Sequence, residues 1–130
     1  MTLNGENKIT LKDVYIGEVW FCSGQSNMGW TIEKSENGQE AHKNANFEKI
    51  KLLNIKRSMS GIPQNDIKEG NKWETCTTKN ANGFSAVACF FGRELYKKYQ
   101  LPIGLIHSSW GGTSIESWMN AEAFKEDNTK

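Results

Sequence analysis

The chain has 130 residues, 37% of them hydrophobic and 24% charged, which is typical of one folded domain, or part of one, rather than of a disordered or membrane-embedded chain. Sixteen basic and fifteen acidic side chains leave a net charge of +1, so nothing in the charge points to nucleic acid or an anionic membrane as a partner. No apolar run reaches the roughly 20 residues that span a bilayer, and "MTLNGENKIT" lacks the apolar core of a signal peptide.

The first half of the chain predicts two buried strands. Residues 9–21, "ITLKDVYIGEVWF", alternate at first and then become continuously apolar at 19–21. This predicts a half-buried lead-in strand, within residues 1–16, followed by a strand covered on both faces. Residues 33–49 read as an exposed connection with room for a short helix, and 50–55, "IKLLNI", as a second buried strand. The polar residues 56–83 predict a long irregular segment around Trp73.

The second half predicts a helix, a strand and a further helix. In "FSAVACFFGRELYKKY", apolar residues recur every four positions from Val87 to Tyr99, and Ser85 is a suitable N-cap. Pro102 ends this helix, and "PIGLIHSSW" predicts a third buried strand. "GGTSIESWMNAEAF" then predicts a helix capped by Thr113 or Ser114.

Cysteine usage gives no sign of a disulfide framework or a zinc site. There are three cysteines, without a close pair, and neither kind of site is built from such a set. Cys22 and Cys89 lie in apolar runs and are expected to pack as small hydrophobic residues, whereas Cys76 in "WETCTTKN" is expected to be more exposed. No metal and no cofactor is predicted.

The alternation of strands and helices predicts an α/β fold with a parallel sheet and helices on both faces. Ligands of such sheets bind beyond the carboxyl ends of the strands. Two strands end there in small residues, "SGQSNM" and "SSWGGTS". We therefore expect these two turns to lie side by side.

The two turns contain the parts of a nucleophilic site. Ser26 follows a strand, Gly24 permits a tight turn, and a helix starting at Asn27 would favour negative charge beside the serine. The Gly111–Gly112 pair offers unobstructed backbone N–H groups for an oxyanion. The alternative is an ordinary strand-to-helix turn. Neither G-x-G-x-x-G nor a Walker loop is present, so nucleotide binding is not expected.

"GEVWFCSGQSNM" together with "FSAVACFFGRELYKKYQLPIGLIHSSWGGTSIESW" closely resembles the sialate O-acetylesterase family of the SGNH-type, or GDSL-like, hydrolases. The resemblance implies a three-layer, flavodoxin-like α/β fold and metal-free removal of acetyl groups from sugars. It implies that Ser26 is the nucleophile and donates its own N–H to the oxyanion hole. A glycine of "WGGT" supplies a second donor, Gly111 by choice and Gly112 as the alternative.

Two family blocks are missing from the chain. One resembles W-Y-Q-G-E and completes the oxyanion hole, and the other resembles D-x-x-H and carries the histidine base. No aspartate here is followed by histidine three residues later. We therefore interpret residues 1–130 as the N-terminal half of the catalytic domain, with the first three core strands, and expect the chain alone to be inactive. His42 is expected to be exposed, and His107 to shape the pocket or hydrogen-bond locally.

The expected partner is an acetylated carbohydrate. Gln25, Asn27, Trp30, His107 and Trp110 border the two turns and are the candidates for substrate binding. Acetylated xylan or another glycan is an alternative to sialic acid. A non-catalytic carbohydrate-binding fragment, and a fragment that self-associates or pairs with the rest of its domain, are alternatives to an enzyme. Family members often act outside the cytoplasm, but the sequence itself gives no compartment.

Overall fold

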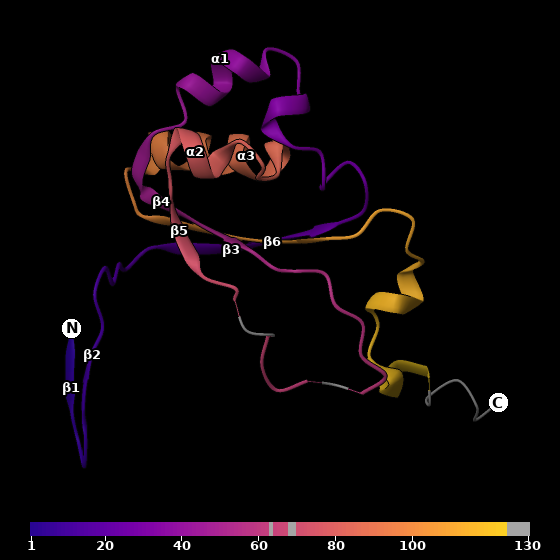
Figure 1. Ribbon diagram of the computed structural model, residues 1–130, viewed down its shortest axis with the longest axis horizontal. Coiled ribbons are helices and arrows are strands. Elements are labelled where there is room, and N and C mark those ends of the chain that lie inside the picture. Colours follow the sequence, from indigo (N-terminus) through magenta and orange to yellow (C-terminus); the bar gives the residue numbers. More distant parts are fainter. Residues whose placement is uncertain (63, 68–69, 125–130) are drawn as a thin grey trace.

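A computed structural model describes residues 1–62, 64–67 and 70–124. A two-stranded hairpin precedes a four-stranded sheet with three short or medium helices (Figure 1). In chain order the elements are β1 (Thr2–Asn4), β2 (Lys8–Thr10), β3 (Glu18–Gly24), the 3-10 turn η1 (Ile32–Lys34), α1 (Gly38–Lys43), β4 (Phe47–Asn54), β5 (Trp73–Cys76), α2 (Thr78–Ala81), α3 (Ala86–Tyr99), β6 (Ile103–Ser109), η2 (Ile115–Trp118) and η3 (Ala121–Phe124).

The sheet has the order β3-β6-β4-β5, with β6 between the other two predicted strands. β3 and β4 both run parallel to β6, which confirms the predicted α/β fold with parallel core strands. β5 pairs antiparallel with β4 and makes the sheet mixed. The sequence analysis missed β5 because this strand has only four residues and lies inside a long polar segment.

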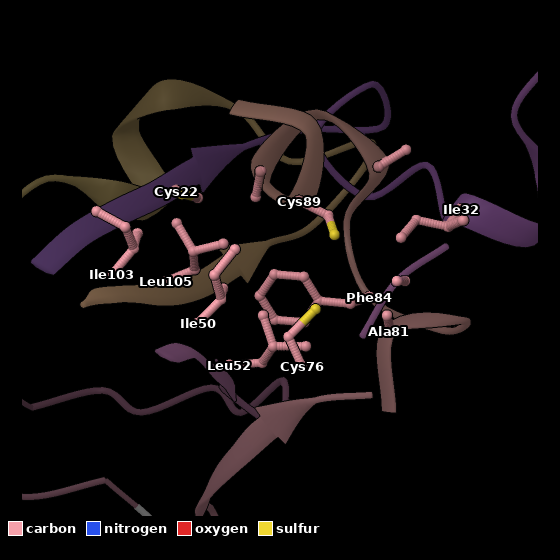
Figure 2. Close-up of a cluster of buried hydrophobic side chains, with 13 residues drawn as sticks. Cys22, Ile32, Ile50, Leu52, Cys76, Ala81, Phe84, Cys89, Ile103 and Leu105 are labelled. Carbon is pink, nitrogen blue, oxygen red and sulfur yellow. The ribbon is translucent and has the colours of Figure 1, made fainter. Parts of the chain in front are cut away.

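The core lies between β6 and α3. Alternate residues of β6 are buried, beginning with Ile103 and Leu105. These side chains share one hydrophobic cluster with the small residues Ala88 and Cys89 on the buried face of α3, and Figure 2 shows this cluster. The Ser85 hydroxyl accepts a hydrogen bond from the backbone N–H of Ala88, at 3.2 Å, and caps α3 as predicted. This packing fixes β6, and with it the turn that follows β6, against the most regular helix of the chain.

The structure corrects four of the predictions about strands, cysteines and helices. In β3, Val19 and Phe21 are 62% and 65% exposed, because β3 is an edge strand of the described sheet and the helices α1 to α3 all lie on one side of that sheet (Figure 1). The lead-in region is the exposed hairpin β1–β2 instead of one half-buried strand. Cys76 is fully buried, since it ends β5 beneath Phe84 and Cys89. The closing helix is replaced by η2 and η3, and Ser114 makes no side-chain cap.

Gly17 marks the start of the parallel β3–β6 pair. The backbone N–H of Glu18 donates to the Pro102 carbonyl at 3.0 Å, and a Cβ added at Gly17 would lie only 2.0 Å from that oxygen. Backbone atoms cannot rotate away as a side chain can, so the two chain segments would have to separate.

We expect Gly17→Ala to lower the free energy of unfolding by about 1–3 kcal/mol, the usual cost of forcing atoms into a filled space. Urea denaturation measures the change. Gly61→Ala is the matched control, because a Cβ there meets no atom of the described residues within 4 Å. Equal stabilities of the two variants would contradict the predicted clash.

Candidate active site

The turns after β3 and β6 lie side by side, as the sequence predicts. The last register pair of these strands is Gly24 with Ser109. Beyond it, the backbone N–H of Trp110 donates to the Gly24 carbonyl at 3.1 Å. The Gln25 side-chain amide donates to the Thr113 carbonyl and ties the two turns together a second time. Gln25, a candidate for substrate binding, thus has an amide hydrogen already used within the protein.

Ser26 faces Gly111 across these turns. A Cβ added at Gly111 would lie 3.2 Å from the Ser26 Cβ and 3.4 Å from the Ser26 backbone nitrogen. Gly24 has φ of +149°, which side-chain-bearing residues rarely adopt, and this conformation lets the chain turn sharply off β3. Ser26 is exposed, and among the described residues none hydrogen-bonds to its hydroxyl. The arrangement therefore presents a free serine hydroxyl beside a glycine backbone.

Gly112 differs from Gly111 in its backbone conformation and in the space around it. Its φ is +79°, and a Cβ there would meet no atom of the described part of the chain within 4 Å. Of the two glycines that the sequence offered as oxyanion donors, Gly111 is the one in contact with Ser26.

The serine begins a single turn and not a helix, so the condition of a helix starting at Asn27 is not met. The backbone N–H of Gly29 donates to the Gln25 carbonyl at 3.0 Å, and that of Trp30 donates to the Asn27 carbonyl at 3.2 Å. Regular structure resumes only at η1. Without several aligned peptide units there is no helix dipole at Ser26, so any oxyanion here depends on individual N–H groups.

His107 makes two side-chain hydrogen bonds within the core. Its Nδ1 donates to Asn54 Oδ1 at 2.8 Å, and its Nε2 accepts from the Ser109 hydroxyl at 2.7 Å. The ring is 9% exposed and packs edge-on against Phe84. Both ring nitrogens are occupied, so the geometry confirms a local hydrogen-bonding role. The chain of hydrogen bonds from Ser109 through His107 to Asn54 has the same order of groups as a catalytic triad. Ser109 is buried, however, so its hydroxyl is not presented to a substrate.

The environment of His107 disfavours its charged form. Burial first, and then the positive charge of Arg57, lower the pKa of the imidazole from its usual value, against a smaller opposite effect of the Met28 backbone. A folded-state pKa below the unfolded one means that the unfolded chain binds more protons between the two values. The contribution of neutral His107 to stability is therefore complete above the unfolded pKa of about 6.5 and is lost as the pH falls through the folded pKa.

We expect the His107→Gln variant to lack this part of the pH dependence. Urea unfolding between about pH 5 and pH 8 should show the wild-type protein losing its advantage over the variant toward acid pH. Carboxylates titrate in both proteins and cancel in the comparison. A constant difference at every pH would contradict the assignment.

Arg57, which the sequence analysis did not single out, lies next to the second turn. Its Nε donates to the Ser109 carbonyl at 3.2 Å, and its guanidinium carbon is 5.7 Å from the centre of the Trp110 ring. Arg57 follows β4 by three residues in a polar loop, so no periodic pattern marked it. Only the β4–β6 pairing, continued by the Ile55 N–H to the His107 carbonyl, shows that it reaches the site.

The remaining candidates have different surroundings. Trp30 is 52% exposed, and its indole N–H donates to the Lys34 carbonyl at 2.8 Å. Asn27 is exposed at the tip of the serine turn. His42 lies in α1 and is only half-exposed, with Nδ1 buried and unpartnered among the described atoms, so the expectation of a solvated histidine was wrong. Among the described residues, neither His42 nor His107 hydrogen-bonds to Ser26.

The described residues contain no group of three His, Cys, Asp or Glu side chains that could hold a metal ion. None of the helices built from these residues is long and apolar enough to cross a membrane.

Comparison with known families and proteins gives consistent matches. Residues 16–128 match the family model described as carbohydrate esterase, sialic acid-specific acetylesterase. The sialate O-acetylesterase of Homo sapiens is 37% identical over 124 residues, which cover 90% of this chain and 24% of that protein. The Mus musculus protein of the same name is 37% identical over 130 residues, with 93% and 24% covered.

A solved structure resembles the described fold. The crystal structure of a carbohydrate acetylesterase from Xanthomonas citri matches with a TM-score of 0.86 and 34% identity, over 96% of this chain and 29% of that one. The chain thus spans about a quarter of the length of the curated relatives it matches.

Proposed function

Because the chain belongs to the family of sialic acid-specific carbohydrate acetylesterases, we propose that it supplies the nucleophile and two oxyanion donors of an enzyme that removes acetyl groups from sugars. The closeness of Ser26 to Gly111, where an added Cβ would lie 3.2 Å from the Ser26 Cβ, is the observation that carries the proposal. The Ser26 hydroxyl is exposed and has no hydrogen-bond partner among the described residues, and it lies next to the unobstructed backbone of Gly111. An acyl-transfer site needs a nucleophile and nearby oxyanion donors.

The reaction proceeds in two steps. The Ser26 oxygen attacks the acetyl carbonyl carbon while its proton passes to a base, and the carbonyl oxygen becomes an oxyanion facing the N–H groups of Ser26 and Gly111. The tetrahedral intermediate then releases the sugar hydroxyl, which takes up the proton, and leaves the acetyl group on Ser26. Water attacks this acetyl-enzyme in the same way and yields acetate. Each donor of this kind is typically worth about 3–4 kcal/mol in the transition state.

We infer that neither of the two histidines of the chain is the general base of this reaction. Both ring nitrogens of His107 are hydrogen-bonded in the core, and His42 belongs to α1. We therefore infer that polypeptide outside these 130 residues supplies the base, and we expect the isolated chain to show no catalytic turnover.

The substrate class follows the family and its named relatives: an acetyl ester on a sugar, with sialic acid first and acetylated xylan or another glycan as alternatives. Trp110 and Trp30 border the serine turn and offer aromatic faces of the kind on which sugars stack. An esterase requires acetate release that depends on Ser26. Sugar binding without acetate release, even with a base-bearing segment present, would instead favour a carbohydrate-binding protein.

A further inference from the structure

Arg57 is held in place beside the serine turn. The chain after β4 continues alongside β6, where the Ile55 N–H donates to the His107 carbonyl at 2.9 Å, and the Lys56 N–H donates to Asn71 Oδ1 at 2.8 Å. These bonds bring Arg57 opposite Ser109, whose carbonyl accepts from its Nε. The guanidinium then lies over the Trp110 ring. Trp110 directly precedes Gly111, so the cation borders the site proposed for acetyl transfer.

The positive charge of Arg57 is not neutralised by a carboxylate of the described chain. The ion pairs found there join Lys72 to Glu74, and Arg93 and Lys97 to Glu94. The backbone bond uses Nε alone, and Arg57 is exposed. Its two terminal nitrogens therefore remain available for a ligand. A guanidinium presents two parallel N–H groups that match the two oxygens of a carboxylate.

We propose that Arg57 binds the carboxylate of an acidic sugar and so selects acidic over neutral acetylated substrates. The proposal rests on the proposed esterase function, because it places the sugar ring against Trp110 and the acetyl group at Ser26. The backbone bond and the Trp110 ring hold the guanidinium before substrate arrives, which reduces the side-chain entropy lost on binding. Sialic acids and uronic acids carry the same carboxylate, and the test separates them.

Isothermal titration of the chain with N-acetylneuraminic acid and with its methyl ester tests the proposal without catalysis. The methyl ester lacks the negative charge of the acid and carries a methyl group on one of the two carboxyl oxygens, and the two ligands are otherwise identical. We expect the acid to bind roughly five- to tenfold more tightly at low salt, as a charge-assisted bidentate contact allows, with the preference falling as salt screens it. Galacturonic acid against galactose is the second arm, and a preference in that arm alone would identify uronates as the source of the carboxylate.

Arg57→Gln should abolish the preference, because it weakens binding of the acid and leaves binding of the methyl ester unchanged. Arg57→Lys keeps the positive charge but lacks the two parallel N–H groups of a guanidinium, so it should retain part of the preference for the acid. Arg93→Gln is the matched control, since it removes the same charge from an arginine that pairs with Glu94 on α3. A wild-type chain without acid preference in either arm, whether both ligands bind alike or neither binds, overturns the proposal. An unchanged preference in Arg57→Gln overturns it as well.

The outcome is separable from that of the proposed function. If acetate release depends on Ser26 while Arg57→Gln changes nothing, the selection by Arg57 fails alone. If acid preference depends on Arg57 while Ser26 proves dispensable, the esterase assignment fails, and the carboxylate site stands as a binding site.

Discussion

Replacing Ser26 with alanine is expected to lower acetate release from an O-acetylated sugar by about a thousandfold or more. Removal of the nucleophile deletes the acetyl-enzyme, and the remaining oxyanion donors and binding contacts account for only a small residual rate. The fold should survive, because Ser26 is exposed and its hydroxyl bonds to nothing among the described residues. The expected signature is a collapse of kcat with little change in substrate binding.

The measurement uses the protein in its active form, with the general base present, and follows acetate release and the mass of the Ser26 peptide. The unmodified protein should carry one acetyl group on that peptide after a rapid quench, and the variant should not. Ser117→Ala, at an exposed serine of η2, is the matched control. A Ser26→Ala protein that keeps its rate would falsify the assignment of the nucleophile.

Replacing Gly111 with alanine is expected to lower kcat/KM by about 10²–10³-fold, equivalent to about 3–4 kcal/mol of transition-state stabilisation. The new methyl group would stand 3.2 Å from the Ser26 Cβ and 3.3 Å from its Cα. That spacing is tighter than ordinary contact, so the serine turn must move by a few tenths of an ångström. Oxyanion donors act only at hydrogen-bond distance. A small displacement of the serine turn should therefore lower kcat more than it lowers the stability of the fold.

Gly112→Ala distinguishes this steric effect from simple backbone strain. With φ of +79° and open space around it, Gly112 should lose about 1–2 kcal/mol of stability on substitution, while Ser26 stays in place. We therefore expect opposite rankings of the two variants in activity and in stability. Gly111→Ala should lose more activity, and Gly112→Ala should lose more stability. Equal losses of activity in both, measured with matched unfolding curves, would contradict the choice of Gly111 as the donor.

The sequence was sufficient to predict the parallel core strands, α3 and the meeting of the two turns. In strongly periodic segments such as α3, the spacing of the apolar residues shows which face is buried. Glycine, serine and asparagine after an apolar run indicate a turn. The proximity of Ser26 to Gly111 followed because parallel neighbouring strands end at the same edge.

The remaining features depended on tertiary contacts that local patterns do not contain. Val19 and Phe21 are as apolar as any core residue, but their exposure depends on what lies over β3. β5 is defined by its partner β4 and not by a pattern of its own. Arg57 and Ser109 are separated by 52 residues, and their contact became visible only when the order of the strands was known.

The position of β6 has a consequence for how the site moves. Gly111 follows a strand that has neighbours on both sides, whereas Ser26 follows β3, which in the described sheet has β6 as its one partner. Edge strands open at a lower free energy than central ones. The serine and its proposed oxyanion donor thus belong to regions of unequal local stability, and the serine side should exchange its amide hydrogens sooner. Opening of β3 would then break the site while the hydrophobic core under α3 stays folded.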